Sequence, residues 1–433
     1  MLLAAILALA AWLHYTVATR SVVSLPMASD ASEYFSYAYN LRRFGVYSDD
    51  LTWAGEAPPG GMRPDSLRTP GYPLFLLAIP GLDASEAWLS RVARVQVVLG
   101  VGSVWLLYLL ARRFLRPGWA HAATALMAIS PHLANLGSYL LSEGLFLFVL
   151  LLSVLASVTA LRGGERWRFV LAGLCWGACA LVRPTVLLLP PLFWLAALAL
   201  PGLHAWRGRA LLLVAVFLAV QSPWFLRNRL ADLDPAQGNL LVWSIHHGSY
   251  PDFMYDGRAE TRGWPFRADP DSVAAERDMG SVLRDLAGKF RRRPLEQLRW
   301  YLLGKPGALL SWGYVQGHDI YVYEAAHSPY RERRSFAALR LLALVLHWPL
   351  MFAGVAAALV AWWRPRWLRL EGEAVVVARV VAAVVLYALA FHVVVAPYPR
   401  YGVPFRPLLY ALAMAWPCAL LARRAGKARA GPG

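Results

Sequence analysis

Charged residues are scarce in this sequence. Acidic and basic side chains make up only 16% of the 433 residues, whereas hydrophobic residues make up 58%. A soluble chain usually carries roughly a quarter of its residues as charge. The charge that is present is unbalanced, because 43 Lys and Arg face 26 Asp and Glu, which gives a formal net charge of +17. The low charge excludes an ordinary soluble domain and directs attention to the apolar segments.

Cysteine is also rare. The three cysteines are Cys175, Cys179 and Cys418, and all of them lie inside apolar runs. A disulfide framework needs paired cysteines in segments outside the membrane, so we expect no disulfide. The sequence has no Cys-x-x-Cys motif and no clustered metal ligands, which argues against a structural zinc site.

Long apolar runs, separated by groups of arginine, recur along the chain. Runs of about twenty residues are typical of transmembrane helices, so the sequence predicts an all-α integral membrane protein with about ten spans. The first run lacks the basic start and the cleavage site of a signal peptide, and we interpret it as a span. The expected spans are residues 2–18, 93–111, 119–136, 140–161, 169–182, 185–200, 210–220, 339–362, 374–395 and 408–421.

The arginine groups predict the orientation of the chain. They fall on alternate short loops, at residues 112–116, 162–168, 207–209, 364–369 and 423–429. Because such groups mark the cytoplasmic side, we expect a multi-pass protein of the bacterial inner membrane with both termini in the cytoplasm. The positive charge is then explained by contact with membrane lipids and not by nucleic acid binding. The oligomeric state is not predicted.

This orientation divides the chain into three parts. Residues 1–222 form an N-terminal membrane module that contains a first large external loop over about residues 19–92. Residues 223–338 form a second external loop, and residues 339–433 hold the last spans and a basic cytoplasmic tail. External loops of this length are long enough to carry a site.

Two carboxylates lie three residues apart at the start of a predicted surface helix over 31–44. Asp30 and Glu33 occur in Asp30-Ala-Ser-Glu-Tyr, and this spacing places both on one helix face. One interpretation is a general base at the membrane surface. The other is a capping Asp followed by a capping-box Glu. The motif alone favours neither interpretation.

Six groups of short motifs follow one another along the chain. They are Asp30-Ala-Ser-Glu-Tyr with Asn40-Leu-Arg-Arg-Phe-Gly, Arg68-Thr-Pro-Gly-Tyr-Pro, Ser130-Pro131 with Leu141-Ser-Glu, the Gly-rich run from Gly173 to Arg183-Pro184, Pro223-Trp224 with Arg227-Asn228, and Pro399-Arg400-Tyr401. Together they resemble the GT-C membrane glycosyltransferases. The branch with the most similar motifs holds the protein O-mannosyltransferases and the aminoarabinose transferases of lipid A.

The resemblance implies a sugar donor on polyprenyl phosphate and an inverting transfer on the outer face. It makes Asp30 the base, with Glu33 a second candidate, and Arg68 a ligand of the phosphate. The aminoarabinose transferases usually have Lys-Pro-Pro where this chain has Arg68-Thr-Pro-Gly, which puts the phosphate ligand in doubt. Further candidates for substrate or phosphate binding are Tyr72, Glu143, Arg183, Arg227, Arg400 and Tyr401.

Each of these charged candidates has a structural alternative. A charged side chain at the end of a span can extend to the headgroups or lock two helices through an ion pair. The resemblance implies no nucleotide or flavin cofactor. Some GT-C branches bind a divalent metal ion through loop carboxylates, so metal dependence stays open.

Two motifs in the second external loop suggest metal or sugar-nucleotide binding. His246 and His247 are adjacent, so their side chains point in different directions, and no further ligand lies at ligand spacing; we expect a loop position without metal. Asp269-Pro270-Asp271 mimics the Asp-x-Asp motif of nucleotide-sugar enzymes. Because the loop is external, we expect a turn and a helix cap there.

Two other functions suit a protein with many spans. A lipid or glycan transporter would carry charged groups near the middle of several spans, whereas the ionisable residues here gather at the predicted outer ends. A glycan polymerase or ligase keeps its important Arg and His residues late in the chain, and Asp30 would then be incidental. The leading hypothesis is the glycosyltransferase.

Overall fold

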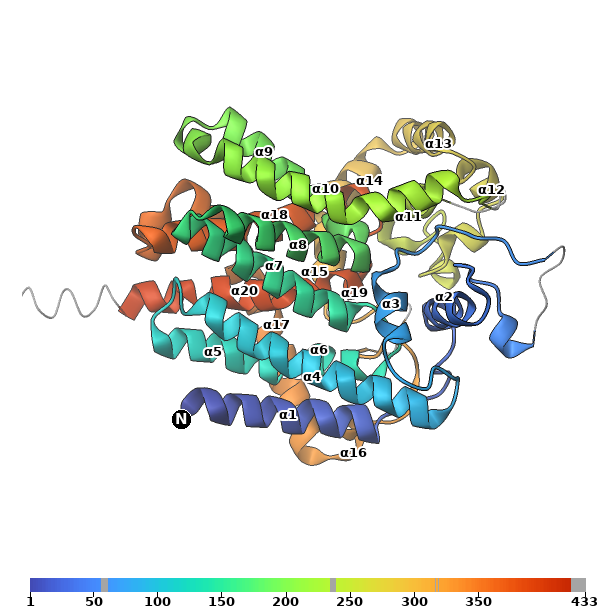
Figure 1. The fold of residues 1–433 in the computed structure, drawn as a ribbon, viewed down its shortest axis with the longest axis horizontal. Coiled ribbons are helices and arrows are strands. Elements are labelled where there is room, and N and C mark those ends of the chain that lie inside the picture. Colours follow the sequence, from blue (N-terminus) through green and yellow to red (C-terminus); the bar gives the residue numbers. More distant parts are fainter. Residues whose placement is uncertain (56–60, 234–238, 316, 318, 422–433) are drawn as a thin grey trace, which may run out of the picture.

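The protein is a bundle of helices that lie side by side along its longest dimension (Figure 1). The computed structural model describes residues 1–55, 61–233, 239–315, 317 and 319–421, so the predicted basic tail lies outside the described residues. The expected all-α membrane architecture is confirmed. The bundle helices are α1 (Leu2–Arg20), α4 (Glu86–Ala111), α5 (Pro117–Ala128), α7 (Glu143–Gly163), α8 (Arg166–Val182), α9 (Leu189–Ala199), α10 (Arg207–Leu230), α17 (Arg334–Trp363), α18 (Glu373–Val394) and α20 (Arg406–Ala413).

Fewer helices are long enough to cross a membrane than the ten expected. Within the described residues, seven are long and apolar enough: those at Leu2–Arg20, Glu86–Ala111, Glu143–Gly163, Gly202–Leu230, Arg334–Trp363, Glu373–Val394 and Pro399–Leu421. Helices α5, α8 and α9 have only 12, 17 and 11 residues. Twelve helical residues extend about 18 Å, short of the roughly 30 Å hydrocarbon core. Prolines explain part of this shortening, since Pro131 and Pro184 each begin a new helical segment.

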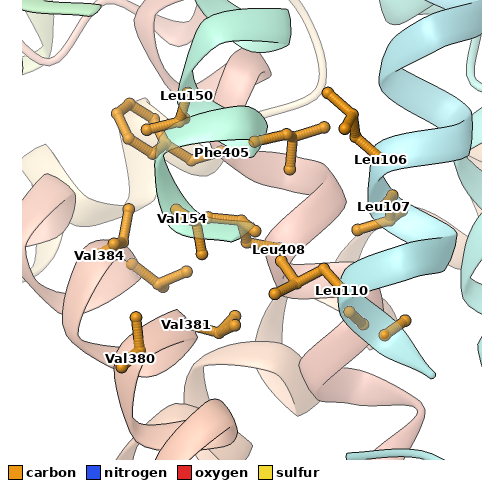
Figure 2. Close-up of a cluster of buried hydrophobic side chains, with 14 of the residues drawn as sticks. Leu106, Leu107, Leu110, Leu150, Val154, Val380, Val381, Val384, Phe405 and Leu408 are labelled. Atoms are coloured by element: carbon orange, nitrogen blue, oxygen red, sulfur yellow. The ribbon is translucent and has the colours of Figure 1, made fainter. Parts of the chain in front are cut away.

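The centre of the bundle is a close-packed apolar layer (Figure 2). Leu107 of α4, Val154 of α7, Val381 of α18 and Leu408 of α20 are all fully buried and belong to one cluster. Helices within a membrane associate through close packing, because lipid tails are as apolar as their side chains. This layer therefore holds together spans from both halves of the sequence.

Glycine lets α8 and α10 approach closely. A Cβ atom at Gly173 would lie 2.6 Å from the carbonyl oxygen of Leu213, and one at Gly177 would lie 2.6 Å from Cβ of Val220. Both distances are shorter than real Cβ contacts. Gly173 and Gly177 lie one turn apart on α8. The Gly-rich run of the sequence therefore forms a helix interface of small residues.

Two long segments gather at one end of the bundle, here named the loop end. The first long segment (residues 21–85) contains α2 (Asp30–Phe44) and α3 (Gly71–Leu77), and the second (residues 231–333) contains α11 (Leu240–His247), α12 (Ser272–Ala275), α13 (Met279–Arg292), α14 (Pro294–Arg299), a π-helical turn (Trp300–Gly304), α15 (Lys305–Leu310) and α16 (Pro329–Glu332). The N-terminus lies at the opposite end (Figure 1). The helix expected over 31–44 is confirmed.

A short antiparallel pairing joins the two long segments. Strand β1 (Val22–Val23) pairs with β2 (Ala325–His327), with Val22 opposite His327. Helix α10 runs through Pro223 to Leu230, so the domain boundary expected after residue 222 falls inside a helix. The second segment consequently starts eight residues later than the sequence pattern suggested.

Candidate active site

The two carboxylates at the start of α2 both contact Arg68. Its Nη2 lies 2.9 Å from Oδ1 of Asp30, and its Nε lies 2.7 Å from Oε2 of Glu33. The other oxygen of Asp30 accepts a hydrogen bond from Nη2 of Arg400. Ser29, with a positive φ of 50°, holds the N-cap position of α2. The carboxylates therefore bind arginine side chains, and the capping interpretation of this motif is wrong.

A second set of charges lies beside the first. Glu143, the first residue of α7, has only 2% of its side chain exposed, and its Oε1 lies 2.7 Å from Nη1 of Arg183 at the end of α8. The same oxygen lies 3.5 Å from Nε of Arg400. Arg400 belongs to α19 (Pro399–Gly402) and bridges Asp30 and Glu143. Three carboxylates and three guanidinium groups thus form one network, named here the charge network.

Burial of the charge network is costly, which makes it a candidate site. The side chains of Asp30, Arg68, Arg183 and Arg400 are 15–21% exposed, and Glu143 is almost inaccessible. Charges taken out of water lose hydration free energy that pairing only partly restores. Ionisable groups that gather at the end of a bundle of membrane helices are rare and usually serve function, so we take the charge network as the candidate site.

The end of α8 holds Arg68 in place. A Cβ atom at Gly71 would lie 2.6 Å from the backbone of Leu181, so the start of α3 presses directly on α8. Oγ1 of Thr69 donates a hydrogen bond of 3.4 Å to the carbonyl of Val182. The chain between Arg68 and Gly71 therefore lies against the end of α8 beside Arg183, which gives Thr69 and Gly71 a structural role after the arginine.

Comparison with known proteins identifies the fold. Residues 75–226 match the family model described as dolichyl-phosphate-mannose-protein mannosyltransferase. The structure resembles the archaeal oligosaccharyltransferase AglB from Archaeoglobus fulgidus, solved with an inhibitory peptide and a dolichol-phosphate, with a TM-score of 0.50 and 16% sequence identity. The similarity covers 100% of this chain and 52% of that protein, so the chain spans about half its length. This chain has a GT-C fold.

Other comparisons are consistent with the GT-C fold or add nothing to it. A second structure of the A. fulgidus enzyme, tethered to an acceptor peptide, gives a TM-score of 0.51 at 16% identity over 97% of this chain and 49% of that one. ArnT from Cupriavidus metallidurans, solved with undecaprenyl phosphate, gives 0.38 at 15% identity over 98% and 78%, too low for any argument. No curated protein matches the sequence. The resemblance that the motifs predicted is confirmed.

Aromatic side chains border the charge network. The guanidinium carbon of Arg183 lies 4.8 Å from the ring centre of Tyr401, and that of Arg68 lies 5.4 Å from that of Tyr34. Tyr72 is fully buried; it packs edge-on against Tyr34 and its hydroxyl donates to Oε1 of Gln96 at 3.0 Å. Tyr401 thus borders the charges directly, whereas Tyr72 supports Tyr34 from behind.

Arg227 is placed apart from the charge network. It donates hydrogen bonds to the carbonyl oxygens of Asp65 and Tyr47, and its guanidinium lies over the rings of Tyr47 and Trp224. These contacts tie the end of α10 to the first long segment. The hydroxyl of Tyr47 in turn donates to the carbonyl of Arg68 at 3.0 Å. Arg227 therefore supports the segment that carries Arg68 and does not contact the carboxylates.

Two polar residues of the site were not singled out from the sequence. The hydroxyls of Tyr34 and Ser142 lie 3.0 Å apart, and Ser142 also accepts a hydrogen bond of 3.4 Å from Arg183. Both residues occur inside the quoted motifs, as the last residue of Asp30-Ala-Ser-Glu-Tyr and the middle of Leu141-Ser-Glu. The motifs therefore held the signal, but a hydroxyl group carries no charge that marks it as a site residue in a sequence.

Two acids of the first long segment, Asp30 in the charge network and Asp49 outside it, have pKa values shifted in opposite directions. Burial opposes the charge of Asp30, but the positive charges of Arg400 and Arg68 outweigh it and hold the pKa of that carboxyl well below its usual range. Asp49, farther along the first long segment, behaves in the opposite way. Burial and the neighbouring carboxylate of Asp65 raise the pKa of Asp49 to about 7. Asp30 is therefore ionised at every physiological pH.

The histidine pair of the second long segment is not in a loop. His246 and His247 end helix α11, and Glu276, 30 and 29 residues away, contacts both imidazole rings. The expected loop position is therefore wrong. Glu276 is a third side chain able to bind a metal, and tertiary packing brings it to the histidines from a distant part of the sequence. The backbone N–H of Asp271 donates to Oδ1 of Asp269 at 2.9 Å, which forms the expected turn, and Asp271 holds the N-cap position of α12 without a side-chain capping hydrogen bond.

Proposed function

We propose that this chain is a membrane glycosyltransferase that moves a sugar from a polyprenyl-phosphate donor to an acceptor hydroxyl. The observation that carries the proposal is the buried charge network, in which Asp30 lies between Arg68 and Arg400 at the loop end. We also propose that the loop end faces the outside of a bacterial inner membrane, with both termini in the cytoplasm, since the arginine groups at residues 112–116, 162–168, 207–209 and 364–369 lie at the opposite helix ends.

The reaction needs one base and one cationic pocket. The acceptor hydroxyl gives its proton to the carboxylate of Asp30 as its oxygen bonds to C1 of the sugar. The bond between C1 and the phosphate oxygen breaks, and the phosphate keeps the electron pair. Attack from the face opposite the leaving group inverts the configuration at C1. Arg68 and Arg400 face the carboxylates and can stabilise the negative charge that develops on the leaving phosphate.

The pairing of Asp30 with two arginines has a consequence for this chemistry. A carboxylate whose charge is so well balanced is a weak base. A donor phosphate that binds Arg400 or Arg68 withdraws positive charge from Asp30 and restores its basicity. Donor binding and activation of the base are thereby coupled, and the base is strong only when the donor is present. Glu33, on the same arginine, is the second carboxylate in reach.

The lipid part of the donor is inferred from the fold. The solved AglB structure contains a dolichol-phosphate, and we extend the polyprenyl-phosphate class to this chain. The proposed mechanism assigns its steps to side chains of the charge network and, as the motif resemblance implies, includes no nucleotide or flavin. No divalent metal ion is assigned a role in it.

Transfer from defined donors tests the proposal. Purified wild type should transfer sugar from a panel of polyprenyl-phosphate sugars to membrane acceptors, with Asp30→Asn lowering the rate by about 100-fold or more. The matched control is Glu86→Gln, which replaces an exposed carboxylate at the start of α4 by a carboxamide. This variant should keep wild-type activity. Equal transfer by Asp30→Asn and wild type would remove Asp30 as the base. Movement of intact lipid-linked sugar across vesicles without transfer would make the chain a transporter.

A further inference from the structure

Three metal-ligating side chains meet between α11 and α12, and none of them belongs to the charge network. One oxygen of Glu276 lies 2.8 Å from Nδ1 of His246 and 3.0 Å from Nε2 of His247. One ligand atom from each residue lies within 4.8 Å of the other two. His246 is fully buried, whereas His247 and Glu276 each keep 19% of the side chain exposed. The group is therefore both enclosed and reachable by a small ion.

Hydrogen bonding on the far side of His246 determines which nitrogen carries the proton. The hydroxyl of Tyr250 lies 2.5 Å from Oδ2 of Asp269 and 2.8 Å from Nε2 of His246. A carboxylate only accepts, so the single hydroxyl proton goes to Asp269 and Nε2 of His246 must be the donor to Tyr250. In a neutral imidazole, Nδ1 then points its lone pair at the oxygen of Glu276. A ring nitrogen and a carboxylate oxygen placed in this way can bind one metal ion together.

We propose that Nδ1 of His246, Nε2 of His247 and the carboxylate of Glu276 form a binding site for a divalent transition-metal ion of the Zn²⁺ type. Two imidazoles and one carboxylate are a donor set that Zn²⁺ takes, with water in the fourth position. At metal–ligand distances of about 2.0–2.2 Å, tetrahedral ligand atoms lie roughly 3.3 Å apart. The Glu276 oxygen is a few tenths of an ångström closer than this to each nitrogen, and the three ligand atoms lie within 4.8 Å of one another, so metal binding moves the carboxylate back slightly and brings the two imidazoles together.

The surroundings of the ligands suit a metal site. The chain of contacts from His246 through Tyr250 to Asp269 orients the imidazole from behind, as outer-shell partners do in metal sites. On the remaining sides, His247 stacks on Phe266 at 3.9 Å between ring centres, which fixes the second imidazole. Asp285 lies 3.8 Å from Nε2 of His246, and Lys289 balances its charge at 2.7 Å.

The ion would join two parts of the second long segment that are about 30 residues apart. Helix α11 also packs against the end of α18, where a Cβ atom at Gly248 would lie 2.7 Å from the carbonyl of Val395. Val242, Ile245 and Val395 share one buried cluster. Val395 lies five residues before Arg400. A metal ion bound to α11 would therefore limit the movement of the segment that leads from α18 to Arg400. Its proposed role is support and not sugar transfer.

Metal titration of the full chain tests the site without any activity assay. The purified protein is dialysed against a chelator and titrated with Co²⁺, whose visible absorption reports a four-coordinate site with nitrogen and oxygen ligands. We expect one Co²⁺ per chain, displacement by one equivalent of Zn²⁺, and a Tm that rises with metal concentration. Absence of stoichiometric binding by wild type would overturn the proposal.

Variants assign the binding to these residues. Glu276→Gln and His247→Gln should each weaken Co²⁺ binding at least 10-fold and abolish the metal-dependent rise in Tm. The matched control is His327→Gln, since Nδ1 of His327 lies 2.9 Å from Glu332 in an exposed pair. That variant should bind Co²⁺ as wild type does. Co²⁺ binding that survives Glu276→Gln contradicts the proposed site. If the metal-free Glu276→Gln variant unfolds, Co²⁺ binding by His247→Gln, which changes a partly exposed side chain, tests the site instead.

Discussion

At the scale of single residues, the site depends on how arginine charge is shared among carboxylates. Arg400 contacts both Asp30 and Glu143, and Arg68 contacts both Asp30 and Glu33. The folded-state pKa of Asp30 is lowered from its ordinary value of 3.8. The ion pairs therefore stabilise the folded chain above that ordinary value, and this contribution is lost as the pH falls through the lower folded-state pKa.

Removal of one arginine should move the pH dependence of transfer. In Arg400→Gln, Asp30 keeps only Arg68 as a close cation, so its pKa rises and the acidic limb of the kcat/KM profile moves to higher pH. We also expect kcat/KM to fall by about 10-fold or more at neutral pH, because the phosphate loses a ligand. The profile is measured by single-donor transfer assays across pH 4–9, where wild type should show no acidic limb from Asp30 and Arg400→Gln should show one. Arg94→Gln, which changes an exposed side chain on α4, should give the wild-type profile.

Asp49 supplies a prediction for stability. Its folded-state pKa of about 7 exceeds the ordinary value of 3.8, so its contribution to stability is present below the ordinary value and is lost as the pH rises through about 7. Asp49→Asn removes the unfavourable charge beside Asp65 and should raise Tm at pH 8 by roughly 2–4 °C, with less effect at pH 5. Thermal unfolding in detergent at both pH values measures this. A larger gain at pH 5 than at pH 8 contradicts the assignment.

At the scale of elements, helix contacts made by glycine position the arginines. Gly71 presses α3 against the end of α8, which carries Arg183, while Gly173 and Gly177 seat α8 against α10. The close packing of α8 with its neighbours thus determines where Arg183 lies in the charge network. A small shift of α8 would move Arg183 relative to Glu143.

A pair of alanine substitutions tests this packing. In Gly177→Ala, the added methyl group meets Cβ of Val220 at 2.6 Å, and overpacking of this kind costs about 1–3 kcal/mol. Gly208 lies in α10 with open space around it, so Gly208→Ala should be neutral or stabilise by up to about 1 kcal/mol through helix propensity. Thermal unfolding of the two variants in the same detergent gives the comparison. Equal Tm values for both would show that α8 and α10 tolerate separation.

At the scale of the whole molecule, the two long segments and the arginine-bearing loops occupy opposite ends of the bundle. Helix α4 connects the ends directly: it begins at Glu86 beside the first long segment and ends at Ala111, just before the first arginine group. This separation of loop types is the basis for assigning an outer and an inner side.

Cysteine labelling tests the sides. Ala87→Cys at the loop end should react with a membrane-impermeant maleimide on intact cells, and Gly118→Cys at the other end only after permeabilisation. Native Cys175 and Cys179 are buried, and Cys418 is replaced by Ser to remove background. The reverse pattern of labelling would invert the proposed topology and place the charge network in the cytoplasm.

By itself the sequence determined the class of protein, most of the bundle helices and the two carboxylates of α2. Hydrophobic run length and arginine position act locally, so they can be read from a single segment of chain. The motifs also supplied most members of the charge network, but not their pairing. Only the tertiary structure brought Arg400 to Asp30, 370 positions away, and Glu276 to the two histidines. Ion pairs and metal ligands form through space, and helix packing, which glycine allows here, decides which distant side chains meet.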